Sequence, residues 1–247
     1  MPLAYRYALY LAPTGPWGAT GSRWLGRCAD TGARLAPLPG QPAESQEWTQ
    51  APRHYGLHAT LKPPFRLRAG VTPQALDAAA RELVDGVTPF SIELECEQLR
   101  GFLAWRIAQA DVDGQARIQA LADAAVRNLD ALRAPLTPEE MARRQPQSLS
   151  PAQQAMLERW GYPYVFDTYT FHITLTNKLA GSELEQAEAS IATFADPLRG
   201  QAMPVPGVSI YVQPEPGADF VAARHYHFDG SHADAAGAAY LHGSAAS

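Results

Sequence analysis

The amino-acid sequence predicts an α+β fold of two lobes related by a pseudo-two-fold axis, each with an antiparallel sheet and helices, and a cleft between them. Segments with strand and helix patterns alternate along the chain, one short His-x-Thr-Leu motif occurs in each half, and 247 residues suffice for one large domain with a sizeable core. We expect this bilobal domain to span residues 1–229, followed by a flexible tail over residues 230–247 that has little to bury.

The first half of the chain is predicted to alternate strands and helices. Pro16 near the start of an apolar pattern and Gly32 beyond its end delimit one helix, and Thr72 followed by Pro73 gives the cap and first turn of another. The predicted elements are a strand over residues 5–12, a helix over 16–30, a proline-rich loop over 36–53, a strand from 55 that stops at the Pro63-Pro64 pair, a helix over 72–86, and strands over 90–99 and 102–108.

The second half repeats the pattern around an irregular segment. Apolar residues at three- and four-residue steps predict an amphipathic helix over residues 115–132. Residues 133–164 form the expected helical insertion, with helix starts at Thr137-Pro138 and Ser150-Pro151. The remaining predicted elements are a strand over 165–179, a helix over 182–194 with a capping box at Ser182 and Glu185, and strands over 208–212 and 220–228.

Composition and charge exclude several classes of protein. Two cysteines are too few for a disulfide framework or a thiolate metal site, and a net charge of −5 argues against binding of long nucleic acids. No stretch approaches the roughly 20 apolar residues that cross a bilayer, and Pro13 ends the first apolar run before it resembles a signal peptide. We therefore expect a cytoplasmic protein without a membrane contact. The sequence carries no signal for an oligomeric state.

The repeated motif consists of His58-Ala59-Thr60-Leu61 and His172-Ile173-Thr174-Leu175, each inside a predicted strand. Because side chains alternate along a strand, the histidine and threonine of each copy share one face, and the residues between them form the other. The only two lysines of the chain, Lys62 and Lys178, extend the two histidine faces if the strands continue that far. Each strand then has an apolar face for the core and a polar face for a cleft.

Two such strands side by side would suit a phosphoryl group. A neutral imidazole can take a proton from water, and a protonated one can give a proton to a leaving oxygen. Threonine hydroxyls donate to phosphate oxygens, and lysines offset the developing negative charge. His58 and His172 are the expected catalytic pair, with Thr60, Thr174, Lys62 and Lys178 as substrate ligands, and the scheme needs no metal and no cofactor.

Longer segments resemble a known family. Residues 55–65, 133–137, 159–165 and 171–176 are similar to the two-histidine (2H) phosphoesterase superfamily, in the branch encoded with carbon–phosphorus lyase genes. The resemblance implies a bilobal α+β hydrolase of a ribosyl cyclic phosphate formed in phosphonate catabolism, with 5-phosphoribosyl 1,2-cyclic phosphate as the candidate. It also assigns catalysis to His58 and His172, and phosphate binding to Thr60 and Thr174.

Other cations and three alternative functions complete the expectations. Tyr5 on the first strand and Arg133, Arg143 and Arg144 of the insertion are candidate substrate ligands, the arginines for a second, terminal phosphate. The expected partner is a small phosphorylated sugar or nucleotide. The alternatives are a phosphodiesterase of RNA 2′,3′-cyclic ends or 2′-5′ linkages, a non-catalytic nucleotide-binding module, and a zinc hydrolase that uses His225 and His227.

Overall fold

The computed structural model describes residues 3–144 and 149–242. Its elements in chain order are β1 (Arg6–Leu11), α1 (Gly15–Leu25), α2 (Ser45–Trp48), α3 (Gln50–Tyr55), β2 (Ala59–Phe65), α4 (Pro73–Val84), β3 (Phe90–Ile92), β4 (Leu94–Leu99), β5 (Phe102–Ile107), α5 (Val112–Leu129), α6 (Pro138–Arg144), α7 (Pro151–Trp160), β6 (Ile173–Thr174), α8 (Gly181–Ala195), β7 (Met203–Val205), β8 (Gly207–Gln213), β9 (Val221–His227) and β10 (His232–Asp234). None of the helices in these ranges is long and apolar enough to cross a membrane.

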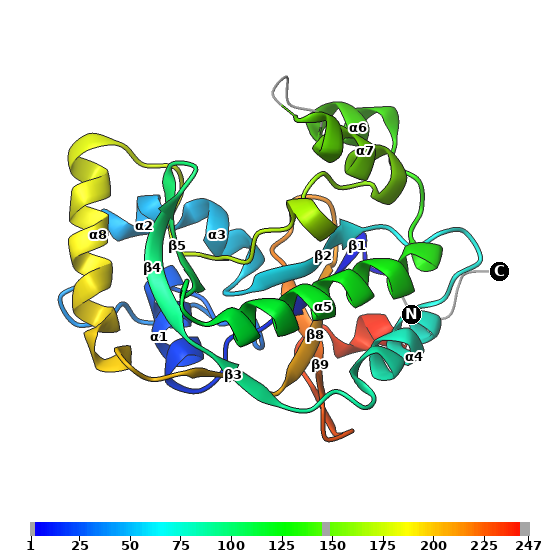
Figure 1. Ribbon diagram of the computed structural model, residues 1–247, viewed down its shortest axis with the longest axis horizontal. Coiled ribbons are helices and arrows are strands. Elements are labelled where there is room, and N and C mark those ends of the chain that lie inside the picture. The colour runs from blue at the N-terminus through cyan, green and yellow to red at the C-terminus, as the bar shows by residue number, and fades with distance from the viewer. Residues whose placement is uncertain (1–2, 145–148, 243–247) are drawn as a thin grey trace.

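The strands confirm a mixed fold with a large antiparallel sheet (Figure 1). Its order is β10-β9-β8-β1-β2-β6-β5-β4, and β3 pairs with β7 in a separate two-stranded sheet. The sequence predicts one sheet per lobe, whereas β2 and β6, which follow the two histidines, are hydrogen-bonded neighbours inside one sheet. The pseudo-two-fold relation between lobes stays a prediction.

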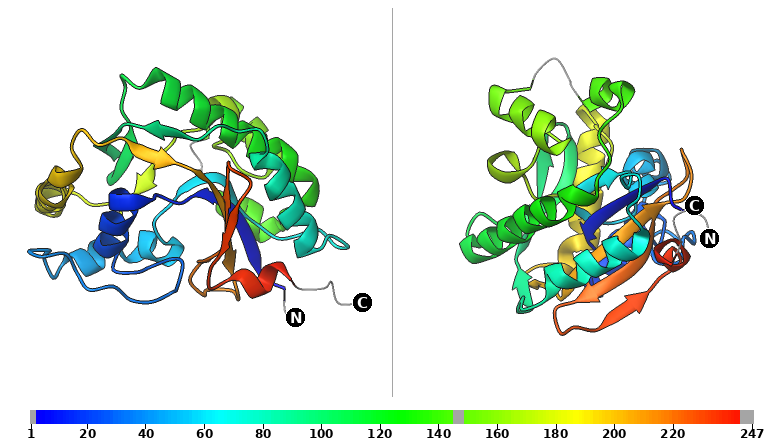
Figure 2. Two further views of the ribbon diagram at one scale, coloured as in Figure 1. Left: turned by 90° about the horizontal axis from the view of Figure 1, so that it is seen from below. Right: turned by 90° about the vertical axis from the view of Figure 1, so that its right-hand side faces the viewer.

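Helices α4 and α5 cover one face of this sheet (Figures 1 and 2). The apolar stripe predicted for α5 is buried there through Ile118, Leu121, Ala125 and Leu129. The opposite face of β1, β8 and β9 carries a second, smaller apolar cluster that includes Tyr10, Tyr211, Phe220 and Ala222. Polar side chains at the edge of that second cluster form the candidate site.

Strand β2 continues through the proline pair at which it was expected to stop. Between Tyr7 and Leu9 of β1, which pair with Phe65 and Lys62, β2 has one residue more than its partner. Pro63 and Pro64 lie in this bulge, where the ladder does not require their missing N–H groups. The sequence pattern shows the prolines but not the bulge that accommodates them.

The predicted strand over residues 165–179 is reduced to Ile173–Thr174. The hydroxyl oxygen of Thr176 accepts the backbone N–H of Leu103 at 3.0 Å, so a side chain replaces the next ladder bond. Helix α8 does follow, but it begins at Gly181 after Ala180, with no side-chain cap, so the predicted capping box at Ser182 and Glu185 is wrong.

The insertion and the C-terminal segment carry regular structure. Helices α6 and α7 begin after Thr137 and Ser150, as predicted, and stand together away from the sheet (Figure 1). Residues 230–242 were expected to belong to a flexible tail, but they carry regular structure. Strand β10 pairs with β9, and Leu241 is buried in a 3₁₀ turn. The last five residues of the predicted tail lie outside the described ranges.

Candidate active site

The two motif histidines lie immediately before β2 and β6 and are held in the same way. Nδ1 of His58 is 2.8 Å from the carbonyl oxygen of Gly56, and Nδ1 of His172 is 2.8 Å from that of Thr170. A carbonyl oxygen only accepts, so each Nδ1 carries the hydrogen. In the neutral ring, Nε2 is then the unprotonated nitrogen, available to take a proton from a ligand or water.

The sheet register brings the two motifs together. Ala59 pairs with Ile173, and both are fully buried on the core side. In an antiparallel pair, the flanking residues point to the other face, so His58 comes beside Thr174 and Thr60 beside His172. Each histidine therefore has the threonine of the other copy as its neighbour, which the sequence alone does not specify.

Two adjoining cavities open on this face. The larger, of about 350 Å³, is lined by Arg6, Tyr10, Tyr55, His58, Thr60, Pro63, Pro64, Glu140, Arg143, Arg144, Tyr162 and Thr174. The smaller, of about 110 Å³, is lined by Thr60, Leu61, Pro63, Arg100, Phe102, Tyr162, Tyr164, Tyr169, Thr170 and His172. Because they share Thr60, Pro63 and Tyr162, we treat them as one cleft, with His58 on one side and His172 on the other.

Burial lowers the pKa of both histidines, which favours the neutral imidazole. Burial, together with the proximity of His172, lowers the pKa of His58 to about 4, against a hydrogen bond from its ring to Gly56 that raises it. The Tyr10 ring stacks on His58 with centroids 3.9 Å apart. Burial and the positive charges of Arg100 and Arg106 also lower the pKa of His172. A bound anion has the opposite effect, because it favours the charged imidazolium.

The two threonines are free to bind a ligand. Thr60 and Thr174 are half-buried, and both line the larger cavity. Within the described residues neither hydroxyl has a hydrogen bond to protein. A partly buried hydroxyl without a protein partner can donate to a phosphate oxygen at little cost.

The two lysines are not in the cleft. Between Tyr10 and Leu9 of β1, which pair with Thr60 and Lys62, Leu61 is an extra residue, and this bulge reverses the alternation of side chains. Lys62 is therefore buried against α5, where its ammonium donates to the Val126 carbonyl at 3.2 Å and lies 3.6 Å from Asp130. Burial lowers the pKa of Lys62 to about 8 despite that ion pair. Lys178 is exposed beyond the short β6 and lines neither cavity.

The candidate residues of the insertion divide into two groups. Arg143 and Arg144 line the larger cavity, whereas Arg133 does not. The guanidinium of Arg133 instead binds the Asp130 carboxylate at 2.9 Å and lies close to Gly161. On β1, the cavity is lined by Arg6 rather than by Tyr5, whose hydroxyl instead contacts the Arg6 guanidinium.

Several further cleft residues are not among the predicted site residues, including Tyr55, Arg100, Glu140 and Tyr169. Of these, Glu140 had a visible signal, since Thr137 and Glu140 have capping-box spacing and do exchange hydrogen bonds in the structure. Arg100 adopts a left-handed conformation, with φ of 51°, in the turn between β4 and β5. Its guanidinium lies over the Tyr164 ring.

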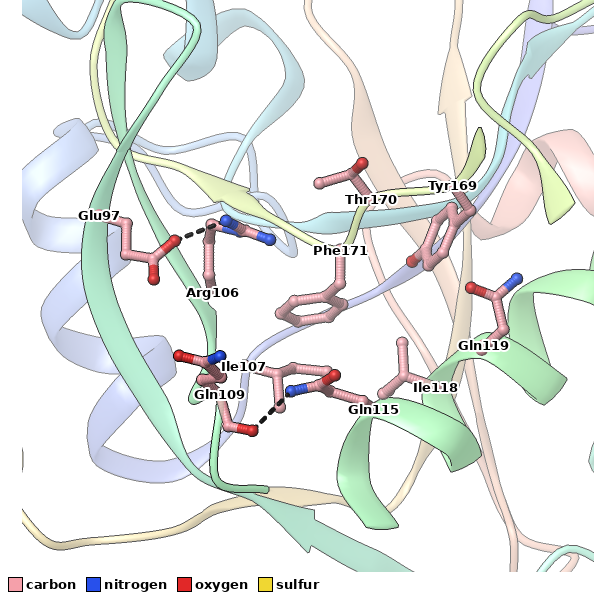
Figure 3. A pocket seen from close by; sticks show the side chains of 10 residues that line it. All are labelled: Glu97, Arg106, Ile107, Gln109, Gln115, Ile118, Gln119, Tyr169, Thr170 and Phe171. Carbon is pink, nitrogen blue, oxygen red and sulfur yellow. Dashed lines mark hydrogen bonds and ion pairs between the residues drawn. The ribbon is translucent and has the colours of Figure 1, made fainter. Parts of the chain in front are cut away.

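A third cavity, of about 430 Å³, lies on the other side of the segment that precedes His172 (Figure 3). The side chain of Phe171 points into it, while the side chain of Thr170 projects from the opposite side of the segment (Figure 3). Three glutamines and the Arg106–Glu97 ion pair line this cavity. None of the residues predicted for the site lines it.

The alternative metal site finds no support in the side-chain arrangement. His225 is bound at both ring nitrogens, to the Ser209 hydroxyl at 2.7 Å and to the Asp30 carboxylate at 3.1 Å. Across residues 3–144 and 149–242, no group of three or more histidine, cysteine or acidic side chains is arranged to hold a metal ion.

Comparisons with known proteins identify similar sequences. A family model described as "Protein of unknown function (DUF1045)" matches residues 60–221. The chain is 37% identical over 221 residues to a protein of Laribacter hongkongensis (strain HLHK9) named ribose 1,5-bisphosphate phosphokinase PhnN, a match that covers 89% of this chain and 51% of that protein. A protein of the same name from Janthinobacterium sp. (strain Marseille) is 35% identical over 235 residues, covering 91% of this chain and 51% of the relative. The chain thus spans about half the length of the curated relatives it matches.

Proposed function

The chain belongs to the DUF1045 family, whose description names no reaction, and from the cleft we propose that it is a metal-independent cyclic phosphodiesterase. The candidate substrate is a ribosyl cyclic phosphate, 5-phosphoribosyl 1,2-cyclic phosphate, hydrolysed in phosphonate catabolism. One observation carries the proposal. Two imidazoles that immediately precede neighbouring strands are anchored through Nδ1 to the backbone, so both Nε2 atoms are available in a cleft whose threonine hydroxyls have no hydrogen-bond partner among the described residues.

In the proposed reaction, the cyclic phosphate lies between the two threonines, whose hydroxyls donate to its non-bridging oxygens. The phosphate charge raises the pKa of both imidazoles, and one of them takes up a proton from solvent at Nε2. The neutral imidazole accepts a proton from water as the water oxygen bonds to phosphorus. The protonated one donates to the ring oxygen as its bond to phosphorus breaks. The products are a phosphomonoester and a free hydroxyl.

The names of the relatives support a phosphorylated ribose as the ligand, but not the kinase reaction for this chain. Both relatives are named for ribose 1,5-bisphosphate and are about twice as long as the matched region. A nucleotide-binding P-loop requires Gly-Lys followed by Ser or Thr. The two lysines of this sequence follow Leu61 and Asn177 instead. We therefore propose that this chain acts on a cyclic phosphate and does not carry out the kinase reaction for which the relatives are named.

The test is hydrolysis followed by phosphorus NMR. The purified protein is incubated with 5-phosphoribosyl 1,2-cyclic phosphate and, in parallel, with RNA 2′,3′-cyclic ends, in the presence of EDTA. We expect conversion of the ribosyl substrate to a monoester, and a loss of roughly 10²- to 10⁴-fold in kcat for His58→Ala and for His172→Ala. His232→Ala, which changes an exposed histidine on β10, is the matched control.

Unchanged kcat in either cleft variant contradicts the proposal. Loss of activity with EDTA and recovery with zinc would favour a metal enzyme, and turnover of the RNA ends alone would assign a different substrate. Binding of phosphorylated ligands without turnover of any cyclic phosphate would indicate a binding module.

A further inference from the structure

We propose that a further cavity of this protein hydrolyses small carboxylic esters by means of Ser209, His225 and Asp30. The inference does not depend on the proposed function, because this cavity shares no lining residue with either part of the cleft. The cavity has a volume of about 620 Å³, which lies in the usual range for a small ligand. Its basis is a chain of two hydrogen bonds that joins a hydroxyl, an imidazole and a carboxylate.

The pairing of β8 with β9 places Ser209 and His225 side by side. The two residues are direct partners in the antiparallel ladder. Side chains of such partners project from the same face of the sheet, with Cβ atoms about 5 Å apart. The hydroxyl oxygen of Ser209 lies 2.7 Å from Nδ1 of His225. Ser209 is buried and His225 half-buried, and both line the cavity, so a ligand inside it can contact both.

Asp30 completes the arrangement from the turn that follows α1. Its Oδ1 lies 3.1 Å from Nε2 of His225. The turn is held by backbone hydrogen bonds, since the carbonyl oxygen of Ala29 accepts the Ala222 N–H at 2.9 Å and that of Asp30 accepts the Ala236 N–H at 2.8 Å. The hydrogen bond from His225 lowers the pKa of the Asp30 carboxyl, although burial opposes the shift. An ionised carboxylate is therefore fixed beside one nitrogen of the ring.

These contacts determine the tautomer of His225. A carboxylate only accepts, so Nε2 carries the hydrogen of the neutral ring, and Nδ1 accepts the hydroxyl hydrogen of Ser209. A general base beside a nucleophile requires this state, with a carboxylate to stabilise the imidazolium that forms. In the known Ser-His-Asp enzymes the serine binds Nε2 and the aspartate Nδ1. The exchange of the two nitrogens here leaves the roles of the three residues unchanged.

The other histidines of the chain lack this combination. His54 contacts the Asp219 carboxylate at 2.9 Å through Nδ1 but has no hydroxyl partner. His58 and His172 are anchored to backbone carbonyl oxygens. Within the described residues, His225 alone joins a hydroxyl to a carboxylate, and it does so at the wall of a cavity.

The start of α1 supplies hydrogen-bond donors to the same cavity, because Thr14, Gly15 and Gly18 line it. The helix has no side-chain cap, and the Thr14 hydroxyl donates instead to the Pro204 carbonyl oxygen at 3.2 Å. The first N–H groups of a helix have no acceptor inside the helix, and together with the helix dipole they favour a negative oxygen. This end of the cavity can therefore stabilise an oxyanion.

The rest of the wall fits an apolar acyl group. It is formed largely by small or apolar side chains, among them Ala12, Pro13, Ala19, Leu35, Leu57 and Pro206.

In the proposed reaction, Nδ1 of His225 takes the hydroxyl proton of Ser209 as the serine oxygen bonds to the carbonyl carbon of the ester. The oxyanion that forms accepts hydrogen bonds from the N–H groups at the start of α1. The imidazolium gives its proton to the alcohol oxygen as the carbon–oxygen bond breaks, which leaves an acyl-serine and a free alcohol. Water then hydrolyses the acyl-serine with the same ring as base, and releases the carboxylic acid. Asp30 stays ionised throughout.

The experiment combines covalent labelling with ester hydrolysis. The wild-type protein is treated with a fluorophosphonate, which modifies activated serines, and the adduct is located by mass spectrometry of peptides. Hydrolysis of p-nitrophenyl butyrate is measured for the wild type and for the Ser209→Ala, His225→Gln, Ser22→Ala and His58→Ala variants. Ser22→Ala is the matched control, because Ser22 lines the same cavity but has no histidine partner within the described residues.

We expect a fluorophosphonate adduct at Ser209 that is absent from Ser209→Ala. In His225→Gln it should form roughly 10²- to 10⁴-fold more slowly, which is the usual contribution of a general base. The kcat/KM for p-nitrophenyl butyrate should fall in parallel in these two variants. Ser22→Ala and His58→Ala should hydrolyse the ester like the wild type. Urea unfolding of each variant verifies that it is folded, and the labelling of the wild type needs no variant.

Several results would overturn the proposal. A wild-type protein without an adduct at Ser209 and without ester hydrolysis above the buffer rate refutes it, and a lowered urea midpoint of Ser209→Ala would then assign the three side chains a purely structural role. Undiminished hydrolysis in Ser209→Ala also refutes it, as does a loss in His58→Ala, which would assign the activity to the cleft. The cyclic phosphodiesterase is tested on its own substrate and is unaffected by these results.

Discussion

The neutral state of His58 leads to a prediction on stability that does not depend on substrate. The pKa of His58 is lowered from 6.5 to about 4 in the folded protein, mainly by burial. Between those values the unfolded chain binds more protons than the folded one, so the free energy of unfolding decreases as pH falls below 6.5. The contribution of His58 is fully present above pH 6.5 and is lost progressively toward pH 4.

The magnitude follows from the two pKa values. One pKa unit corresponds to 1.36 kcal/mol. At pH 4.5, protonation of His58 in the unfolded chain therefore lowers the free energy of unfolding by about 2 kcal/mol relative to pH 7. The measurement is urea unfolding followed by tryptophan fluorescence at pH 7.0 and 4.5, for the wild-type protein, His58→Gln and the control His232→Gln.

Other groups also titrate over this range, so the informative quantity is the difference between variants. The wild type should lose about 2 kcal/mol more than His58→Gln over the pH interval, and His232→Gln should lose as much as the wild type. Parallel curves for the wild type and His58→Gln would show that His58 ionises equally in both states, and would refute a buried neutral imidazole.

Three further predictions concern the rest of the site. Lys62→Met should leave kcat within about twofold of the wild type in the hydrolysis assay, because the ammonium faces α5; a large loss would place Lys62 in the cleft after all. The profile of kcat/KM against pH should be a bell with both limbs below pH 6.5, one of them near pH 4, since both imidazoles have lowered pKa values in the free protein; a maximum above pH 7 contradicts this. Gly161→Ala should lower the free energy of unfolding by about 1–2 kcal/mol in urea, because φ is 73° and the new Cβ would lie 2.8 Å from the Arg133 guanidinium; an unchanged midpoint would argue against that contact.

The sequence was most informative where a local signal and a motif coincide. Thr72-Pro73, Thr137-Pro138 and Ser150-Pro151 each mark the start of a helix, because a cap and a proline act within one turn. The repeated His-x-Thr motif led to two segments that the structure makes neighbours in the sheet. Their catalytic role remains a prediction.

The features that the sequence did not reveal depend on strand pairing and on tertiary packing. Lys62 was expected beside His58 because the strand period is two, and the bulge at Leu61 that moves it to α5 is a property of the pairing with β1. Arg133 was likewise expected to bind substrate, but in the folded chain Asp130 and Gly161 surround its guanidinium and it lines neither part of the cleft. Residues such as Tyr55 and Arg100 join the cleft through tertiary packing and have no motif of their own.

The equivalent anchoring of the two rings has a consequence for selectivity. His58 and His172 present the same nitrogen from the same kind of backbone support, so under the proposed function the sheet does not dictate which oxygen of a bound ring departs. That choice falls to the unlike surroundings, with the arginines of α6 near His58 and Arg100 with Tyr164 near His172. If the proposed function holds, sequence changes confined to the insertion would redirect bond cleavage and leave the histidine pair intact.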